Sequence, residues 1–170
     1  MKKLFALALT LCLLCGCTAL AENEITWEQV APIVEAGNMT GDFVAIDEVA
    51  AKIWIPAGFV EADAGQEGVV KYFAPEDGSE SYIAVVYVDA NGMELAEYAE
   101  KIAANGATEV ETGTVNGIPC VSYELADSQT MGLTFATQAG YLLDVVIAPV
   151  SSDEEKMAAG VILASIQAAE

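Results

Sequence analysis

The sequence predicts an α+β fold, an α/β/α sandwich around a largely antiparallel sheet, with a short N-terminal helix before it. Three observations support this class. Eight short segments rich in apolar residues are bounded by turn signals, as β-strands are. Turns rich in glycine, asparagine and proline join neighbouring segments, as in hairpins. Two amphipathic segments interrupt the strands, so the expected order along the chain is ββββ-α-ββββ-α.

The first half of the chain should hold the N-terminal helix and four strands. Thr26 and Gln29 have the spacing of a capping box, which marks the start of a helix. Pro32 limits this helix, and the glycine-containing stretch 37–41 ends it. The last strand of this half, residues 82–88, is apolar on both faces, so we expect the sheet to be covered on two sides. The four expected strands are 43–46, 52–55, 69–73 and 82–88.

The second half should hold a helix, four more strands and a terminal helix. The segment 93–104 carries an apolar stripe at helical spacing. Asn116-Gly117 is typical of a two-residue hairpin turn. Ser151 or Ser152 caps the final helix, whose first turn is acidic and so opposes the helix dipole favourably. The four expected strands are 110–115, 118–125, 131–137 and 141–148.

Residues 1–21 have the pattern of an export signal. Two lysines precede a short apolar run that is too short to span a bilayer as a mature helix. Two processing sites compete within it. Leu14-Cys15-Gly16-Cys17 resembles a lipobox, which would place a lipid on Cys17 and hold the domain on the outer side of a cell membrane. Ala19-Leu20-Ala21 fits ordinary signal peptidase, which would release a secreted protein.

The rest of the chain has the length of one domain. Residues 22–42 should form the short helix and a linker, and residues 43–170 a single α+β domain. A chain of this size can bury a core without staples. Cys120 is the one cysteine after the signal, and its apolar neighbours favour a small buried hydrophobe over a reactive thiol.

The charge of the exported part restricts its partners. Four lysines against 26 acidic residues leave a net charge of −22, with no arginine and no histidine. Nucleic acid requires cationic contacts, and anionic lipid would be repelled, so membrane attachment should come only through lipid at Cys17. The acidity either serves as a solubilising surface or attracts cations or a basic partner.

The sequence contains few residues typical of catalysis. Without histidine there is no Ser-His-Asp or Cys-His machinery, and we expect neither an enzyme nor a metal or other cofactor. Residues 89–92 begin like a calcium loop but fit a turn better. Two residues are pocket candidates. Asp144 lies within an apolar strand. It is either a perturbed carboxylate in a pocket, or it lies at a rim or is the structural partner of a lysine such as Lys52 or Lys71. Trp54 is either a stacking platform or an ordinary sheet aromatic.

Three segments resemble the PsbP-like superfamily. They are the strand and turn 53–59, the hairpin 115–119 with the strand running to Tyr123, and Gly140-Tyr141 entering an apolar strand. The resemblance covers residues 43–169 and rests on turns and core positions. It implies the α/β/α sandwich already described. The superfamily includes an extrinsic photosystem subunit, a nuclear-transport GTPase cofactor and small bacterial lipoproteins, and its members act mainly by binding proteins.

Together these features favour a non-enzymatic accessory lipoprotein of a bacterial envelope that recognises another protein. The first alternative is an extracytoplasmic protein that binds a small ligand or a cation. The second is a histidine-free hydrolase that uses paired carboxylates, since acidic residues are abundant.

Overall fold

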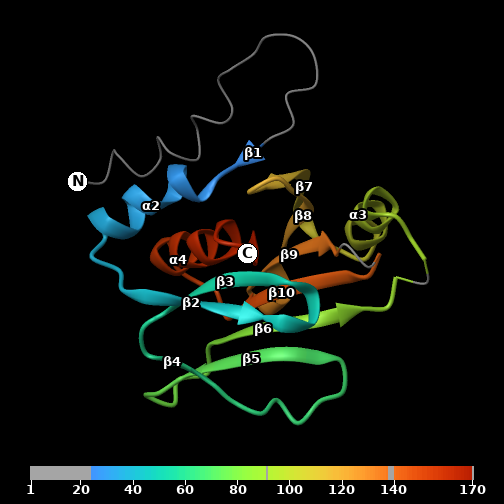
Figure 1. Ribbon diagram of the computed structural model, residues 1–170. Helices are drawn as coiled ribbons and strands as arrows, with labels where there is room; N and C mark the ends of the chain where they lie inside the picture. The colour runs from blue at the N-terminus through green and yellow to red at the C-terminus, as the bar shows by residue number, and fades with distance from the viewer. Residues whose placement is uncertain (1–23, 91, 138–139, 170) are drawn as a thin grey trace.

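The computed structural model describes residues 24–90, 92–137 and 140–169 (Figure 1). The export signal and the predicted lipid site at Cys17 lie outside these residues, as do Asn91 and residues 138–139 of two predicted turns. Within the described ranges, no helix is long and apolar enough to cross a membrane.

The largest element of the described chain is an eight-stranded sheet in the order β1-β7-β8-β9-β10-β6-β5-β4. Its neighbours pair antiparallel except for β1 with β7, so the sheet is mixed. The α+β class is therefore confirmed. The strands are β1 (Glu24–Ile25), β4 (Phe59–Glu61), β5 (Val69–Pro75), β6 (Tyr82–Val88), β7 (Thr108–Val115), β8 (Ile118–Leu125), β9 (Thr130–Ala136) and β10 (Leu142–Ala148).

A second sheet of three strands lies against the first. It has the order β11-β3-β2 and consists of β2 (Gly41–Ile46), β3 (Ala51–Pro56) and β11 (Gln167–Ala168). The expectation of a single sheet was wrong. β2 and β3 pair with each other, but the larger sheet does not include them. Hydrophobic alternation fixes which face of a strand is buried, and it does not specify which strand becomes its neighbour.

Helices lie against both faces of the large sheet. The described helices are α2 (Trp27–Ala36), α3 (Leu95–Ala104) and α4 (Asp153–Ala164). Leu133 and Phe135 of β9 pack into the core with α4, whereas Thr134 between them donates to Asp144 on the face that also holds Tyr98 of α3. Because successive side chains of a strand point to opposite faces, α3 and α4 cover opposite sides. Figure 1 shows α4 beside the small sheet and α3 at the far side.

The N-terminal segment packs onto this body. α2 contacts α4, and its capping box at Thr26 and Gln29 is formed. The expectation that Pro32 limits the helix was wrong, because α2 continues to Ala36 with Pro32 inside it. Ile33 and Val34 beyond the proline pack against the core, which offsets the one missing backbone hydrogen bond.

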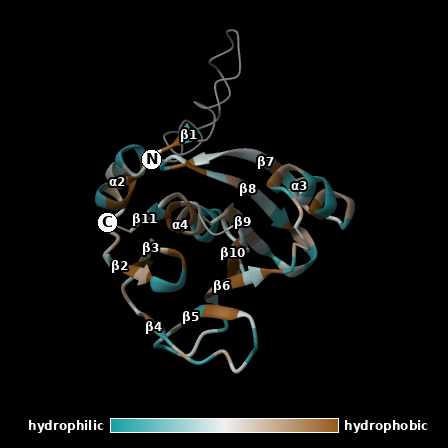
Figure 2. Cartoon of the chain, turned by 45° about the vertical axis from the view of Figure 1, so that its right-hand side comes forward, coloured by the Kyte–Doolittle hydropathy of each residue, from teal (hydrophilic) through white to brown (hydrophobic). Residues whose placement is uncertain are grey.

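The main core lies between the large sheet on one side and α4 with the small sheet on the other. Its fully buried side chains include Ile46 and Ile53 of the small sheet, Ile83 and Leu143 of the large sheet, and Ile166. Figure 2 shows hydrophobic and hydrophilic colours alternating around α2 and α3, and a hydrophobic stretch on β5. The predicted two-sided cover of β6 holds only for its first half, since Ile83 to Val85 are buried while Tyr87 is 44% exposed.

Candidate binding cleft between the two sheets

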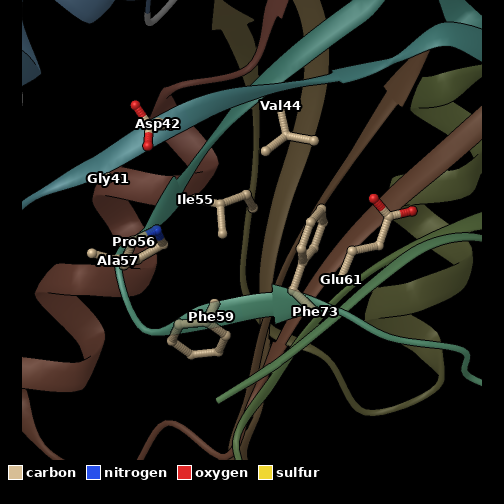
Figure 3. A pocket seen from close by; sticks show the side chains of 9 residues that line it. All are labelled: Gly41, Asp42, Val44, Ile55, Pro56, Ala57, Phe59, Glu61 and Phe73. Atoms are coloured by element: carbon tan, nitrogen blue, oxygen red, sulfur yellow. The ribbon is translucent and has the colours of Figure 1, made fainter. Parts of the chain in front are cut away.

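A cleft of about 230 Å³ opens where the two sheets diverge (Figure 3). Its apolar surface comes from Val44 of β2, Ile55 of β3, Phe59 of β4 and Phe73 of β5, with Pro56 and Ala57 at one end. The carboxyl-bearing side chains of Asp42 and Glu61 lie on either side of this apolar surface in Figure 3. The site thus combines an apolar floor with an acidic rim.

The chain makes this cleft by changing sheets at one tight turn. β3 belongs to the small sheet and β4 to the large one, yet only Ala57 and Gly58 separate them. Gly58 has φ +91°, a conformation that glycine adopts without strain. Because two strands that follow one another so closely enter different sheets, their neighbours β2 and β5 are held apart and leave an opening between them.

Gly41 brings the edge of the small sheet close to the tryptophan beneath it. A Cβ at this position would meet the Ile55 carbonyl oxygen and the Trp54 ring at less than contact distance. Glycine is therefore required at the first residue of β2. This close approach fixes where the β2 edge lies beside the cleft.

The rim carries more negative than positive charge. Lys71 forms an ion pair with Glu61 at 2.8 Å. The Glu61 hydrogen bond raises the pKa of Lys71 above its ordinary value, and the nearby carboxylates of Glu48 and Asp47 raise it further. One lysine thus faces several carboxylates, and Asp42 adds another on the opposite side.

Asp144 is buried and lies away from this cleft. It is 6% exposed and accepts hydrogen bonds from the Tyr123 hydroxyl at 2.5 Å and from Thr134 Oγ1 at 3.0 Å. Burial raises its pKa to about 6, although both hydrogen bonds favour the charged form. The alternatives of a rim position and of a lysine partner were both wrong, because Asp144 is buried and its partners are two hydroxyl groups. The hydroxyl groups come from two neighbouring strands, which the sequence pattern of β10 alone does not reveal.

Trp54 is a core residue in the structure. It is 4% exposed, its ring packs at 37° against Trp27 with centroids 6.3 Å apart, and its backbone N–H donates to Ser165 Oγ at 2.8 Å. The side chain is therefore not accessible as a stacking platform. Cys120 is also buried, and burial raises the pKa of its thiol to about 11, which suits the predicted small hydrophobe.

The residues that form the cleft were not identified from the sequence. Asp42, Glu61 and Phe73 come from three different strands and meet only because the sheets diverge beside the turn at Gly58. In the sequence, each of these three residues resembles an ordinary strand residue, so nothing marks it as part of a site. The dipeptide Ala57-Gly58 between two short apolar segments was the one local signal that the chain turns here.

A second exposed feature is a pair of tyrosines near the C-terminal end of β6. Tyr87 and Tyr141 pack edge to face with centroids 6.2 Å apart and are 44% and 62% exposed. In the part of the chain that the structure describes, no group of histidine, cysteine, aspartate or glutamate side chains is placed to hold a metal ion.

The comparisons with known proteins found similarity only among solved structures. Neither a family model nor a curated protein matches the chain. The Ran-binding protein Mog1p of Saccharomyces cerevisiae is 12% identical, with a TM-score of 0.39 over 78% of this chain and 97% of that chain. A protein from Bacteroides thetaiotaomicron is also 12% identical, with a TM-score of 0.41 over 71% of this chain and 46% of that chain. Membership of the PsbP-like superfamily stays a prediction from the sequence.

Proposed function

We propose that this protein is a non-enzymatic binding module that recognises another protein through the cleft between its two sheets. The observation that carries the proposal is the combination of an apolar floor, an acidic rim and two sheet-edge strands, β2 and β4, at one opening.

The size of the cleft favours a protein partner over a small ligand. Sites that enclose drug-sized ligands usually have volumes of roughly 300–1,000 Å³, and they bury most of the ligand surface. This cleft of about 230 Å³ is smaller and is open to solvent. It suits the insertion of a few side chains from a larger surface that rests on its rim.

The charge of the molecule favours a basic partner. The acidic groups at the rim are Asp42 and Glu61, and Lys71, which pairs with Glu61, also feels the carboxylates of Glu48 and Asp47. The whole chain carries a net charge of −20. The negative electrostatic field of such a molecule accelerates association with a positively charged surface and disfavours association with an acidic one.

The proposed place of action is outside the cytoplasm. The export pattern in residues 1–21 supports this, and lipid at Cys17 would hold the domain at the outer face of a membrane. Cleavage after Ala21 would instead give a secreted binding protein with the same cleft.

The proposal is tested by capturing partners from cross-linked cells that make the protein, with two charge-reversal variants compared. Asp42→Lys changes the rim, and Glu100→Lys makes the same charge change on exposed α3, across the large sheet. We expect a stoichiometric partner with the unaltered chain and with Glu100→Lys, and its loss with Asp42→Lys. Equal recovery with both variants would contradict a role for the cleft. The intact mass of the recovered chain reports whether Cys17 carries lipid.

A further inference from the structure

We propose that the partner binds as an added antiparallel β-strand along the free edge of β2, with its basic side chains on the cleft side and its apolar side chains toward Phe43. This inference rests on the proposed function, since it specifies the form of the partner at the same cleft.

The backbone of β2 has one row of polar groups free to accept such a strand. The N–H of Ala57 donates to the carbonyl of Thr40 at 2.7 Å, in the same register that pairs Asp42 with Ile55 and Val44 with Ile53. Along an antiparallel strand, the backbone N–H and C=O groups of successive residues point alternately toward one neighbouring strand and the other. The N–H and C=O groups of Gly41, Phe43 and Ala45 therefore point away from β3. Among the described residues, none of these groups has a backbone partner.

The side chains of β2 alternate between the two faces of the small sheet, and an added strand would extend both faces. Asp42 and Val44 line the cleft, whereas Phe43 lies on the other face and is 39% exposed. Lysine or arginine side chains on the cleft side would lay their apolar stems over Val44 and place their charges near Asp42 and Glu61. Apolar side chains on the other face would cover Phe43, which already packs against Trp27.

Charge decides between a partner and a second copy of this chain. Two copies paired edge to edge along β2 would bring their Asp42 carboxylates and two chains of net charge −20 together. A charged side chain that points inward on an edge strand is a recognised guard against self-pairing. The same charge attracts a basic strand, so the occupant is an extended basic segment of another protein.

The test uses the isotope-labelled protein and the synthetic peptide Lys-Val-Lys-Val-Lys-Val-Lys as the probe. A matched control peptide carries backbone N-methyl groups on its valines. This keeps the charge and side chains but removes the N–H donors that valines opposite Phe43 would give to β2 in an antiparallel pairing. We expect the unmodified peptide to bind and to slow amide hydrogen exchange at Phe43 and Ala45 about tenfold or more, with little change at Asp42 and Val44, whose amides already point to β3. The N-methylated peptide should bind at least about tenfold more weakly.

The outcomes separate this inference from the proposed function. Binding that perturbs Asp42 and Glu61 but leaves exchange at Phe43 and Ala45 unchanged would overturn strand addition and leave the cleft as a protein site. Equal affinity for the two peptides, or no binding of either, would also overturn strand addition. Dimerisation of the protein without any peptide, removed by Phe43→Lys, would show that a second copy occupies the edge. Partner capture that is unaffected by Asp42→Lys would instead overturn the proposed function itself.

Discussion

Tyr123 on β8 reaches across Gly132 on β9 to donate a hydrogen bond to Asp144 on β10. A Cβ at Gly132 would overlap the Tyr123 ring and its hydroxyl oxygen, so only glycine leaves room for the tyrosine there. Tyr123 and Gly132 are direct partners in the ladder between their strands. Three central strands are thereby joined by one side chain beneath α3, and the buried carboxylate has a donor.

Replacement of Gly132 by alanine should destabilise the protein. The added methyl group forces Tyr123 away from Asp144, and we expect a loss of about 1–3 kcal/mol in the free energy of unfolding. Urea denaturation measures this loss. Gly160→Ala is the matched control, because a Cβ there meets nothing and alanine favours the helix α4, so that variant should gain up to about 1 kcal/mol. Similar stability changes in the two variants would contradict the account of Gly132.

Asp144 should make stability depend on pH in a direction opposite to that of an ordinary paired carboxylate. Its pKa is raised from 3.8 to about 6 in the folded state, so the folded protein holds this proton more tightly than the unfolded chain. The resulting stabilisation is complete below pH 3.8 and is lost as the pH rises through about 6. The rise in pKa corresponds to about 3 kcal/mol.

The variant Asp144→Asn isolates this contribution because it cannot titrate. We expect its stability relative to the unaltered protein to increase between pH 4 and pH 7, by up to about 3 kcal/mol. Asp127→Asn, at an exposed position, controls for the removal of one negative charge. A relative stability of Asp144→Asn that does not change with pH would mean that the carboxylate is not held in a desolvated site.

Asn116 should contribute more to stability than an ordinary turn residue. Its Nδ2 donates to the carbonyl oxygens of Ala164 and Ile166 at 3.0 and 2.8 Å, and its Oδ1 accepts from the N–H of Trp27 at 2.6 Å. Asn116→Gly keeps the left-handed turn and removes these three bonds, so we expect a loss of about 2–4 kcal/mol by thermal or urea unfolding.

Asn38→Gly is the matched control for Asn116. Asn38 is also left-handed, with φ 50°, but it is exposed and glycine there should change stability by no more than about 0.5 kcal/mol. Equal effects at Asn38 and Asn116 would show that backbone strain, rather than the side-chain bonds, controls both positions.

Cys120 should be unreactive in the folded protein. The side chain is 5% exposed, and burial raises the pKa of the thiol to about 11, so little thiolate forms near neutral pH. Iodoacetamide at pH 8 should alkylate the peptide containing Cys120 only after urea is added, as measured by mass spectrometry. Rapid alkylation of the native protein would contradict the burial of this thiol.

The sequence predicted the turns and helix caps that depend only on residues close together in the chain. Asn116 and Gly117 form the hairpin turn with φ 48° and 77°, because the dipeptide itself favours that turn. The predicted cap at Ser152 is present, with Glu155 as its partner. β1, β4 and β11 were not predicted, since segments of two or three residues are too short to show an alternating pattern.

The candidate cleft depends on non-local relationships that no single segment contains. The separation of β2 and β3 into their own sheet places Asp42 opposite Glu61, and the two sheets meet through a core that residues distant in the sequence build together. Asp144 stood out in the sequence as an acid in an apolar strand. Its partners Tyr123 and Thr134 follow from strand order, which alternation does not fix.

Site-specific photo-crosslinking in the cells that make the protein tests the central claim most directly. Benzoylphenylalanine would replace Phe43 at the β2 edge or, in a separate variant, Tyr141 at the exposed tyrosine pair. Tyr141 is 62% exposed and Phe43 only 39%, so random collisions would favour adducts at Tyr141. We predict a discrete protein adduct from position 43, lost on addition of Asp42→Lys, and none from position 141. An adduct from position 141 with none from position 43 would contradict recognition at the cleft.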